Sequence, residues 1–290
     1  MSRANFDRLG PPPRRVPAAL TLRTLLGGSL GVSGWFVLAI STPFFWGFAM
    51  NADVLSPLLF RTGVTRVEGR VLKVAQTGAS ANNVSIYSVA YAYRDAAGAE
   101  RTGRSYSSGP PRLEATATVE YLKLRPQWSR IEGLRRGMFG PGALVVLAFP
   151  AIGVALVGIA LHSGRKTLRL LAQGQIAQAQ FVSEEETNMK INGRPVLGLN
   201  FEFTASDGQR HSIHHSTSTP GALRDERRET ALYDPETPDD ALLMDQLPDA
   251  VAANEQGEIV AQGRGSLLAG LIPFLTLLMN GGCAVREFLR

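Results

Sequence analysis

The sequence has only one cysteine, Cys283, among its 290 residues, so no disulfide can form within the chain. It also lacks a phosphate-cradling glycine loop, a pair of cysteines at zinc-binding spacing and a G-x-S-x-G nucleophile elbow. These absences exclude a disulfide scaffold. They also leave no sequence signature of P-loop nucleotide binding, cysteine-based zinc binding or α/β-hydrolase catalysis.

Charged residues are missing from three windows of 29, 28 and 21 residues. A helix rises about 1.5 Å per residue and the hydrocarbon core of a bilayer is roughly 30 Å thick, so about 20 apolar residues suffice to cross it. We therefore predict transmembrane helices over residues 25–50, 138–162 and 266–285. Because ion and proton paths through helices usually need charged side chains, the empty windows disfavour a transporter.

The first 24 residues contain five arginines and the sequence PPPRR, without apolar periodicity. This composition predicts a disordered basic arm over residues 1–24, either lying near anionic lipid or merely setting the topology. Three spans place the two regions between them on opposite faces of the membrane. Basic residues are nearly balanced between the two sides, nine against eight, so the arginines of the arm favour an inside N-terminus only weakly.

The two regions between the spans repeat one pattern. A shift of 110 residues, which becomes 112 after a two-residue insertion, brings equivalent positions together. The matched pairs include Thr77 with Thr187, Tyr91 with Phe201, Tyr93 with Phe203, Gly98 with Gly208 and Tyr121 with Tyr233. We predict two small antiparallel β domains, over residues 60–133 and 172–250, each an open barrel or bent sheet. The fold class is therefore membrane α plus all-β, with three transmembrane helices alternating with these domains.

Turn and strand signals support this class. Asn82-Asn83 in the first copy and Asn192-Gly193 in the second are typical of hairpin turns. Apolar alternation slips by one residue after Ile86 and again after Val196. Because a slip would turn every following side chain to the other face, we expect a β-bulge at the same place in both copies, with the aromatic face inside.

Several stretches give the chain a family resemblance. They are VEGRVLKV from Val67, VAYAYRDAAG from Val89, SRIEGL from Ser129, FEFTASDGQRH from Phe201 and LYDPETPDDALL from Leu232. The chain resembles the bacterial membrane proteins grouped as the domain of unknown function 3592 family, in two tandem copies. The resemblance implies a β domain between two spans and a multi-pass protein of the bacterial inner membrane, and it implies no activity. The first copy departs from the family pattern, since YLKLRPQ from Tyr121 replaces the Tyr-Asp-Pro turn.

The densest group of ligand-type side chains is HSIHH, residues 211–215. In a strand, His211 and His215 share a face and His214 points the other way. His211 and His215 are therefore candidate metal ligands, with Glu202 or Asp207 as further donors. The other interpretations are a solvated polar strand or a pH-sensitive interaction surface. We predict no cofactor and no catalytic residues, so these two histidines are the only metal candidates we name.

Two further features bear on partners. Gly27 and Gly31 lie four residues apart in the first span, a spacing that lets helices approach closely and favours a homo-oligomer. The first soluble region carries a net charge of +6 and the second −6, which favours different partners for the two domains. We expect the lipid bilayer, other envelope proteins or anionic envelope components as partners, and no nucleic acid. The predicted function is a non-enzymatic interaction module of the cell membrane; the alternative is a membrane-tethered metal-dependent enzyme centred on the second β domain.

Overall fold

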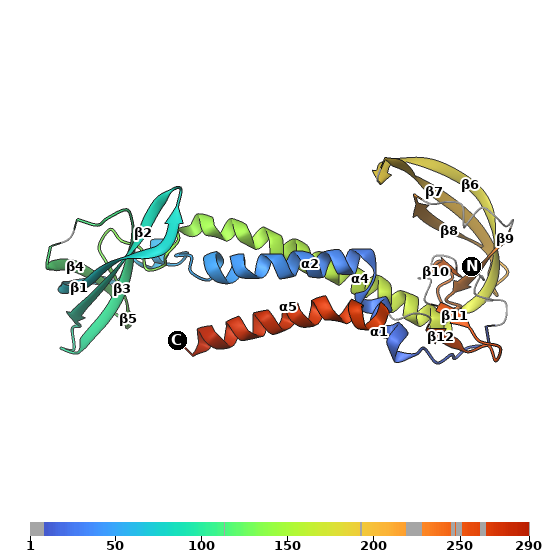
Figure 1. The fold of residues 1–290 in the computed structure, drawn as a ribbon, viewed down its shortest axis with the longest axis horizontal. Coiled ribbons are helices and arrows are strands. Elements are labelled where there is room, and N and C mark those ends of the chain that lie inside the picture. Colours follow the sequence, from blue (N-terminus) through green and yellow to red (C-terminus); the bar gives the residue numbers. More distant parts are fainter. Residues whose placement is uncertain are drawn as a thin grey trace. The chain divides into compact units, whose positions relative to one another are not determined.

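The structure, a computed structural model, describes residues 9–112, 114–191, 193–218, 228–244, 247, 251–261 and 265–289 (Figure 1). These residues fall into two compact units. One unit contains residues 40–151 and 283–289, including the first β domain. The other contains the second β domain, within residues 9–39 and 152–282.

Within the described residues, three helical segments are long and apolar enough to cross a membrane, as predicted: Ser29–Ala49, Pro141–Gln173 and Ala269–Arg286. The first consists of α2 (Ser29–Phe44) and a π-helical turn, η2 (Phe45–Ala49). The second begins as a 3-10 helix, η3 (Pro141–Leu147), and continues as α4 (Ala148–Gln173). The third lies within α5 (Gly265–Phe288). These lengths indicate a multi-pass membrane protein.

Helices α2 and α4 approach closely at glycines. A Cβ atom on Gly34 would lie 2.9 Å from the backbone nitrogen of Val157, and one on Gly153 would lie 2.7 Å from Cγ of Leu38. Small residues at such crossings allow helix backbones to pack without intervening side chains. The two apolar helices are therefore in direct contact along this part of their length.

The first β domain is a five-stranded antiparallel sheet in the order β3-β2-β1-β4-β5. Its strands are β1 (Val64–Ala81), β2 (Val84–Arg94), β3 (Glu100–Ser108), β4 (Thr116–Leu122) and β5 (Arg125–Ile131). The backbone N–H of Ile131 on β5 donates a 2.9 Å hydrogen bond to Oγ of Ser105 on β3. This contact joins the two edge strands, so the sheet curls into a nearly closed barrel around the buried rings of Tyr91, Tyr93 and Tyr121.

The second β domain has the same strand order, β8-β7-β6-β9-β10, as the repeat predicts. Its strands are β6 (Gln175–Ile191), β7 (Arg194–Thr204), β8 (Arg210–Thr217), β9 (Arg228–Tyr233) and β10 (Ala241–Leu243). Phe201, Phe203 and Tyr233 occupy its buried face. The predicted fold class, membrane helices with two small antiparallel β domains, is therefore confirmed.

The turns follow the predicted chemistry where the structure describes them. Asn82 and Asn83 both adopt positive φ angles, 51° and 65°, as a type I′ hairpin turn requires. Gly193 has a φ of 78°, while Asn192, the other residue of the second predicted hairpin turn, lies outside the described residues.

Irregularities in strand pairing also coincide between the copies. The register shifts between Gln76 and Ser80 in β1, and between Glu186 and Lys190 in β6, positions related by the 110-residue shift. The predicted irregularity is thus present at the same place in both domains, with its additional residues in the first strand of each. It lies opposite the positions where the apolar alternation slips.

In each domain, a threonine hydroxyl bridges the irregularity just described. Oγ1 of Thr77 donates to the carbonyl of Ile86 at 2.7 Å and accepts from the N–H of Ala79 at 3.3 Å. Oγ1 of Thr187 makes the equivalent contacts with Val196 and Met189 at the same distances. The matched threonines therefore satisfy backbone groups that the bulged strands leave out of the ladder.

Replacing Thr77 by Val should lower the free energy of unfolding of the first domain by about 1–2 kcal/mol, because the shape is kept while two hydrogen bonds are lost. Amide hydrogen exchange of β1 and β2 in the full chain measures the change. Thr65→Val is the matched control, since the Thr65 hydroxyl has no hydrogen bond to any residue that the structure describes and its side chain is half-buried on the same strand. Equal effects of the two substitutions would contradict the bridging role.

A tyrosine ties one turn to the barrel in each domain. The hydroxyl of Tyr121 accepts a hydrogen bond from the N–H of Ala96 at 2.9 Å, and the hydroxyl of Tyr233 accepts one from Ser206 at 3.0 Å. These tyrosines are the matched pair of the repeat. This hydrogen bond forms in the second copy, which has a Tyr-Asp-Pro turn, and also in the first, which lacks that turn. It requires the tyrosine side chain and not the residues that follow it.

The N-terminal segment differs from the predicted disordered arm. Leu9 and Leu20 are buried, and Leu20 lies in α1 (Ala18–Leu26). The Arg14 side chain donates hydrogen bonds to the carbonyls of Leu171 and Gly174 at the end of α4, at 3.3 and 2.8 Å. The prediction of disorder over residues 1–24 is therefore wrong for residues 9–24, and its first eight residues lie outside the part of the chain that the structure describes. Isolated leucines without periodicity gave no local signal, and their burial depends on partners far along the chain.

That buried cluster also extends the second domain beyond the predicted end at residue 250. A short hairpin, β11 (Val251–Ala253) and β12 (Ile259–Ala261), contributes Val251 and Ile259 to the cluster that contains Leu9 and Leu20. The N–H of Gly10 donates to the carbonyl of Gly257 at 2.9 Å. The segment before the first span is therefore packed against the second β domain. Two predicted spans separate these segments along the chain, and two crossings return the chain to the same side of the membrane, as this packing requires.

Candidate functional site

The predicted metal candidates lie on β8. His211 and His215 face the same way, with Ile213 between them, while His214 is exposed on the other face. Four residues of strand span about 13 Å, whereas Zn–N bonds are about 2 Å long, so the two rings cannot easily reach one ion. Within the described residues, no group of three or more potential ligands gathers around a common point. The shared face follows the prediction, but the structure does not bring the two histidines together.

His211 instead lies between two carboxylates. Its Nδ1 is 2.9 Å from Oδ1 of Asp239 and its Nε2 is 3.4 Å from Oδ2 of Asp207. The hydrogen bond to Asp239, and secondarily that to Asp207, raises the pKa of His211 above its ordinary value. Because the carboxylates contact opposite ring nitrogens, the arrangement favours a protonated imidazolium rather than a neutral metal ligand. Glu202, the other suggested donor, is exposed on the outer face of β7.

The two histidines should titrate on opposite sides of the ordinary histidine pKa of 6.5. Carboxylate hydrogen bonds raise the pKa of His211, whereas burial, and secondarily the charge of His214, lowers the pKa of His215. The stabilisation from His211 is complete below the unfolded pKa and is lost as pH rises through the folded pKa. The stabilisation from neutral His215 is present above the unfolded pKa and is lost as pH falls through the folded pKa.

Histidine-selective NMR of the full chain, which has four histidines, measures both titrations directly. Asp239→Asn should lower the His211 pKa and leave that of His215 unchanged. Identical titration of the two rings in the unmodified protein would contradict the assignment.

The acidic turn after β9 contacts α4. Asp240 forms ion pairs with Lys166 at 2.7 Å and with Arg169 at 2.5 Å, and Asp234 lies 3.3 Å from Arg169. The hydrogen bond from Lys166 is the main cause that lowers the pKa of Asp240. These carboxylates therefore hold the second domain on the helix that precedes it.

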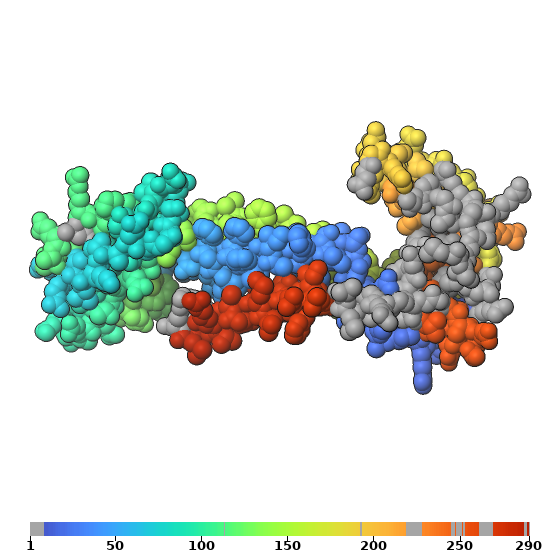
Figure 2. All heavy atoms as spheres, in the orientation of Figure 1, coloured from blue at the N-terminus to red at the C-terminus, as the bar shows by residue number. Residues whose placement is uncertain are grey.

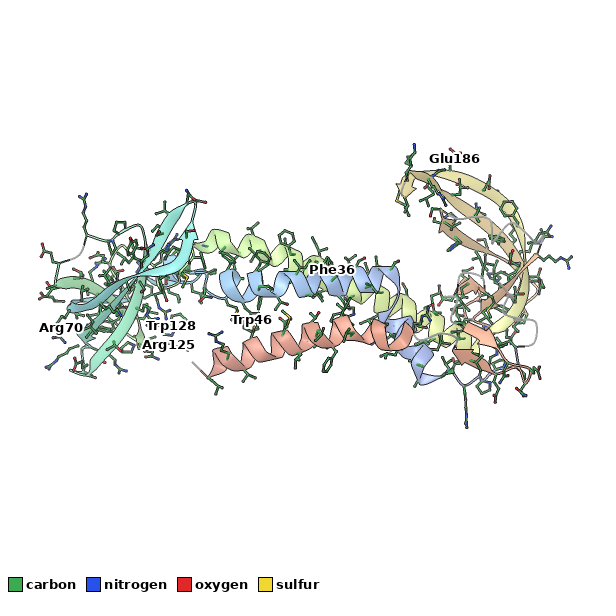
Figure 3. All side chains as sticks on the ribbon, viewed as in Figure 1. Phe36, Trp46, Arg70, Arg125, Trp128 and Glu186 are labelled. Atoms are coloured by element: carbon green, nitrogen blue, oxygen red, sulfur yellow. The ribbon has the colours of Figure 1, made fainter. Side chains whose placement is uncertain are left out.

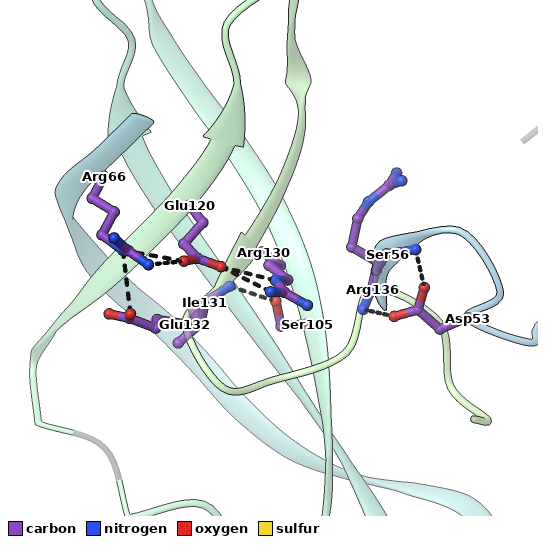
Figure 4. A network of polar contacts seen from close by, with 9 residues as sticks. All are labelled: Asp53, Ser56, Arg66, Ser105, Glu120, Arg130, Ile131, Glu132 and Arg136. Atoms are coloured by element: carbon purple, nitrogen blue, oxygen red, sulfur yellow. Dashed lines mark hydrogen bonds and ion pairs between the residues drawn. The ribbon is translucent and has the colours of Figure 1, made fainter. Parts of the chain in front are cut away.

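The first domain has an ionic triad on equivalent strands, in which a buried carboxylate is paired with two arginines whose side chains are 59% and 21% exposed. Glu120 on β4 is 2% exposed, and its carboxylate accepts hydrogen bonds from Arg66 on β1 and Arg130 on β5 at 2.9–3.1 Å (Figure 4). The Arg130 guanidinium also lies 4.6 Å from the ring centre of Phe60. Both oxygens of the buried carboxylate are therefore paired with cations across three strands.

The second domain has apolar residues at the same three register positions, Ile176, Leu232 and Leu242. Leu232 is fully buried, and it packs in the cluster with Leu170, the residue equivalent to Phe60 under the 110-residue shift. Charged side chains therefore cover this outer face in the first domain, and apolar side chains cover the equivalent face in the second.

A cleft of about 440 Å³ lies at the base of the first domain, next to the segments that join it to η2 and η3. At its base, residues 51–53 are hydrogen-bonded to residues 136–139. The Asp53 carboxylate is buried and accepts hydrogen bonds from the backbone N–H groups of Arg136 at 2.7 Å and Ser56 at 3.2 Å (Figure 4). A Cβ on Gly137 would lie 2.7 Å from the backbone nitrogen of Asp53, so this close approach requires glycine.

Arg136 and Trp128 line one side of this cleft. The Arg136 guanidinium lies 4.5 Å from the ring centre of Trp128, and the Arg125 guanidinium lies 5.9 Å from the same ring. Figure 3 shows Trp128 beside Arg125, with Arg70 lying apart on β1. Among the described residues, no carboxylate forms an ion pair with Arg136. Arg136 therefore presents positive charge on an aromatic surface of the cleft, while Asp53, the one carboxylate among its lining residues, is buried and accepts hydrogen bonds from backbone N–H groups.

Sequence reasoning missed this cleft. Its available signal was the +6 charge of the first soluble region, but Trp128 and Asp53 belong to no spaced motif. Asp53 and Arg136 are 83 positions apart, so only the fold brings them together.

Gly31 lies in α2, whereas Gly27 precedes the span as the C-cap residue of α1, and both contact helices of the same chain. A Cβ on Gly27 would lie 3.2 Å from Cβ of Ala269 in α5, and one on Gly31 would lie 3.4 Å from Cβ of Ala160 in α4. Because α1 ends before Gly27 and α2 begins after it, the two glycines do not share one helix face, although each approaches another helix of the same chain. A homo-oligomer through Gly27 and Gly31 stays a prediction.

No protein-family model matched the chain in a scan, and a search of curated proteins found no match. The resemblance to the domain of unknown function 3592 family therefore stays a prediction.

Proposed function

We propose that this chain is a multi-pass protein of the bacterial inner membrane whose two β domains bind other envelope components and catalyse no reaction. The observation that carries the proposal is the combination of filled barrels and opposite surface charges. Tyr91 and Tyr121 in the first domain and Phe201 in the second are almost fully buried, so large side chains occupy the barrel interiors where a ligand cavity would otherwise lie. Figure 2 shows the outer atoms of the first domain, in cyan and green, beneath which the rings of Tyr91 and Tyr121 are buried.

The net charges of +6 and −6 show that the two domains differ most in the charge of their outer surfaces. Surface charge of one sign favours encounter with partners of the other sign and is not required by the fold. The alternative, a metal-dependent enzyme in the second domain, is not favoured by the position of His211 between two carboxylates.

Site-specific photo-crosslinking of the full chain in intact membranes tests the proposal. We would place the crosslinker at Lys73 on β1 and at Glu185 on β6, both exposed. Each domain is expected to give macromolecular adducts, and the two sets should differ. Phe36, which is exposed on the apolar helix α2, serves as the control and should give lipid adducts alone. Substrate turnover by the purified chain without a partner, or the absence of adducts at both strand positions, would overturn the proposal.

A further inference from the structure

We infer that the cleft at the base of the first β domain binds an anionic phospholipid, through a headgroup phosphate whose charge no cation of the lipid compensates. The inference rests on the proposed function, since it requires that the apolar helices span a membrane. The cleft lies between Met50, the residue that follows the first candidate span, and Met138, which shortly precedes the second. It therefore adjoins the polar ends of both spans.

Aromatic residues place the cleft at headgroup depth. Phe44, Phe45, Trp46 and Phe48 cluster at the end of the first span, and the Phe48 ring packs on Phe139 with centres 4.8 Å apart. Such aromatic clusters settle at the boundary between hydrocarbon and headgroups. Backbone hydrogen bonds connect the Phe139 segment directly to the floor of the cleft, since the N–H of Asp53 donates to the carbonyl of Phe139 at 2.7 Å.

Exposed apolar side chains continue this surface. Val54, Leu55 and Leu58 are 41, 51 and 64% exposed, and they surround the short helix α3 (Ser56–Leu59). The exposure of three large aliphatic residues within five positions is costly in water but is expected of a segment that contacts acyl chains. Lipid rather than a soluble anion is therefore the occupant that fits the whole surface.

The chemistry of the wall selects a phosphate. The Trp128 ring holds the Arg136 guanidinium over its face, and no described carboxylate neutralises it. Arg125, which does not line the cleft itself, brings a second positive charge to the same ring. A guanidinium presents several N–H donors in a fixed plane, which match two phosphate oxygens better than a single donor would. Tyr106, which also lines the cleft, supplies a further hydroxyl.

Native mass spectrometry of the full chain in detergent tests the inference, with phosphatidylglycerol and phosphatidylcholine of identical acyl chains as probes. We expect phosphatidylglycerol to bind about fivefold more tightly, the preference that one basic side chain near the surface supplies. Arg136→Gln should abolish this preference. Arg70→Gln is the matched control, because it removes the same charge from an exposed position of the same domain that does not line the cleft.

Trp128→Leu supplies a second variant, because it keeps every charge. It should weaken the preference for phosphatidylglycerol, which a diffuse charge effect would not do. Equal binding of the two lipids, or equal losses in the Arg136 and Arg70 variants, would overturn the lipid site. Displacement of phosphatidylglycerol by millimolar inorganic phosphate would assign the cleft to a free anion and also overturn it.

The failure of this inference is distinguishable from that of the proposed function. A chain that resists alkaline extraction from membranes but shows no lipid preference loses only the headgroup site. Release of the chain by alkaline extraction would overturn membrane integration, and the lipid site with it.

Discussion

Replacing Arg66 and Arg130 together by Ile and Leu, the residues of the second copy, is expected to destabilise the first β domain by about 3–5 kcal/mol. The substitution leaves the Glu120 carboxylate, which is 2% exposed, without either of the two cations that pair with it across the strands. An unpaired buried carboxylate loses its hydration without compensation. Amide hydrogen exchange of β4 in the full chain should accelerate about 100-fold or more.

Completing the exchange should reverse most of this loss. The triple variant Arg66→Ile, Glu120→Leu, Arg130→Leu reproduces the apolar set Ile176, Leu232 and Leu242, which the second domain uses at the same register positions. Apolar residues of suitable volume often replace a buried ionic triad at little or no cost. We expect the triple variant to lie within about 1 kcal/mol of the unmodified domain.

Glu132→Gln is the control for the triad, since Glu132 also pairs with Arg66 at 3.2 Å but is half exposed. Its effect should stay below about 1 kcal/mol, the usual range of an exposed ion pair. If the double and triple variants were equally unstable, the burial of charge would not be the cause.

Gly34→Val should separate α2 from α4 and lower the stability of the helical segment by about 3 kcal/mol, the upper range for overpacking. A Cβ there would lie 2.9 Å from the side chains of Leu156 and Val157 and equally close to the Val157 backbone nitrogen. Side-chain rotation can relieve the contact with Cγ2 of Val157, but Cβ of Leu156 and the Val157 nitrogen are fixed by the backbone of α4. Unfolding in mixed micelles with increasing fractions of a denaturing detergent measures the loss.

Gly158→Val is the matched control because a Cβ on Gly158 would meet no atom within 4 Å. Both substitutions place the same β-branched residue inside an apolar helix, so the difference in intrinsic helix propensity cancels. Comparable destabilisation by both would show that helix propensity, rather than close packing, accounts for the result.

Much of the fold was predictable because its signals are local. Charge-free length predicts a span, and the alternation that leads to Tyr91 and Tyr93 predicts a strand with its aromatic face inside. The glycines at the turns, Gly98 and Gly208, have φ angles of 77° and 78°, which explains why the repeat keeps glycine at both positions. Each of these inferences needs only neighbouring residues.

The candidate sites were less predictable. His211 and His215 were recognised as sharing a strand face, but the carboxylate that most strongly raises the pKa of His211 belongs to Asp239, 28 positions away. The cleft at the base of the first β domain depends on the hydrogen bond between Asp53 and Arg136, and neither residue belongs to a sequence motif. Spacing along the chain therefore identified residue types without identifying their partners.

The sequence by itself determined three apolar spans, two β domains of one pattern and opposite charges on the two domains. Only the tertiary structure decided that the segment before the first span is ordered, because Arg14 meets carbonyls 157 and 160 positions away. It likewise decided that Glu120 is paired across three strands while Leu232 is packed in hydrocarbon. The physical reason is that length and periodicity are properties of adjacent residues, whereas burial and pairing depend on which distant segments fold against them.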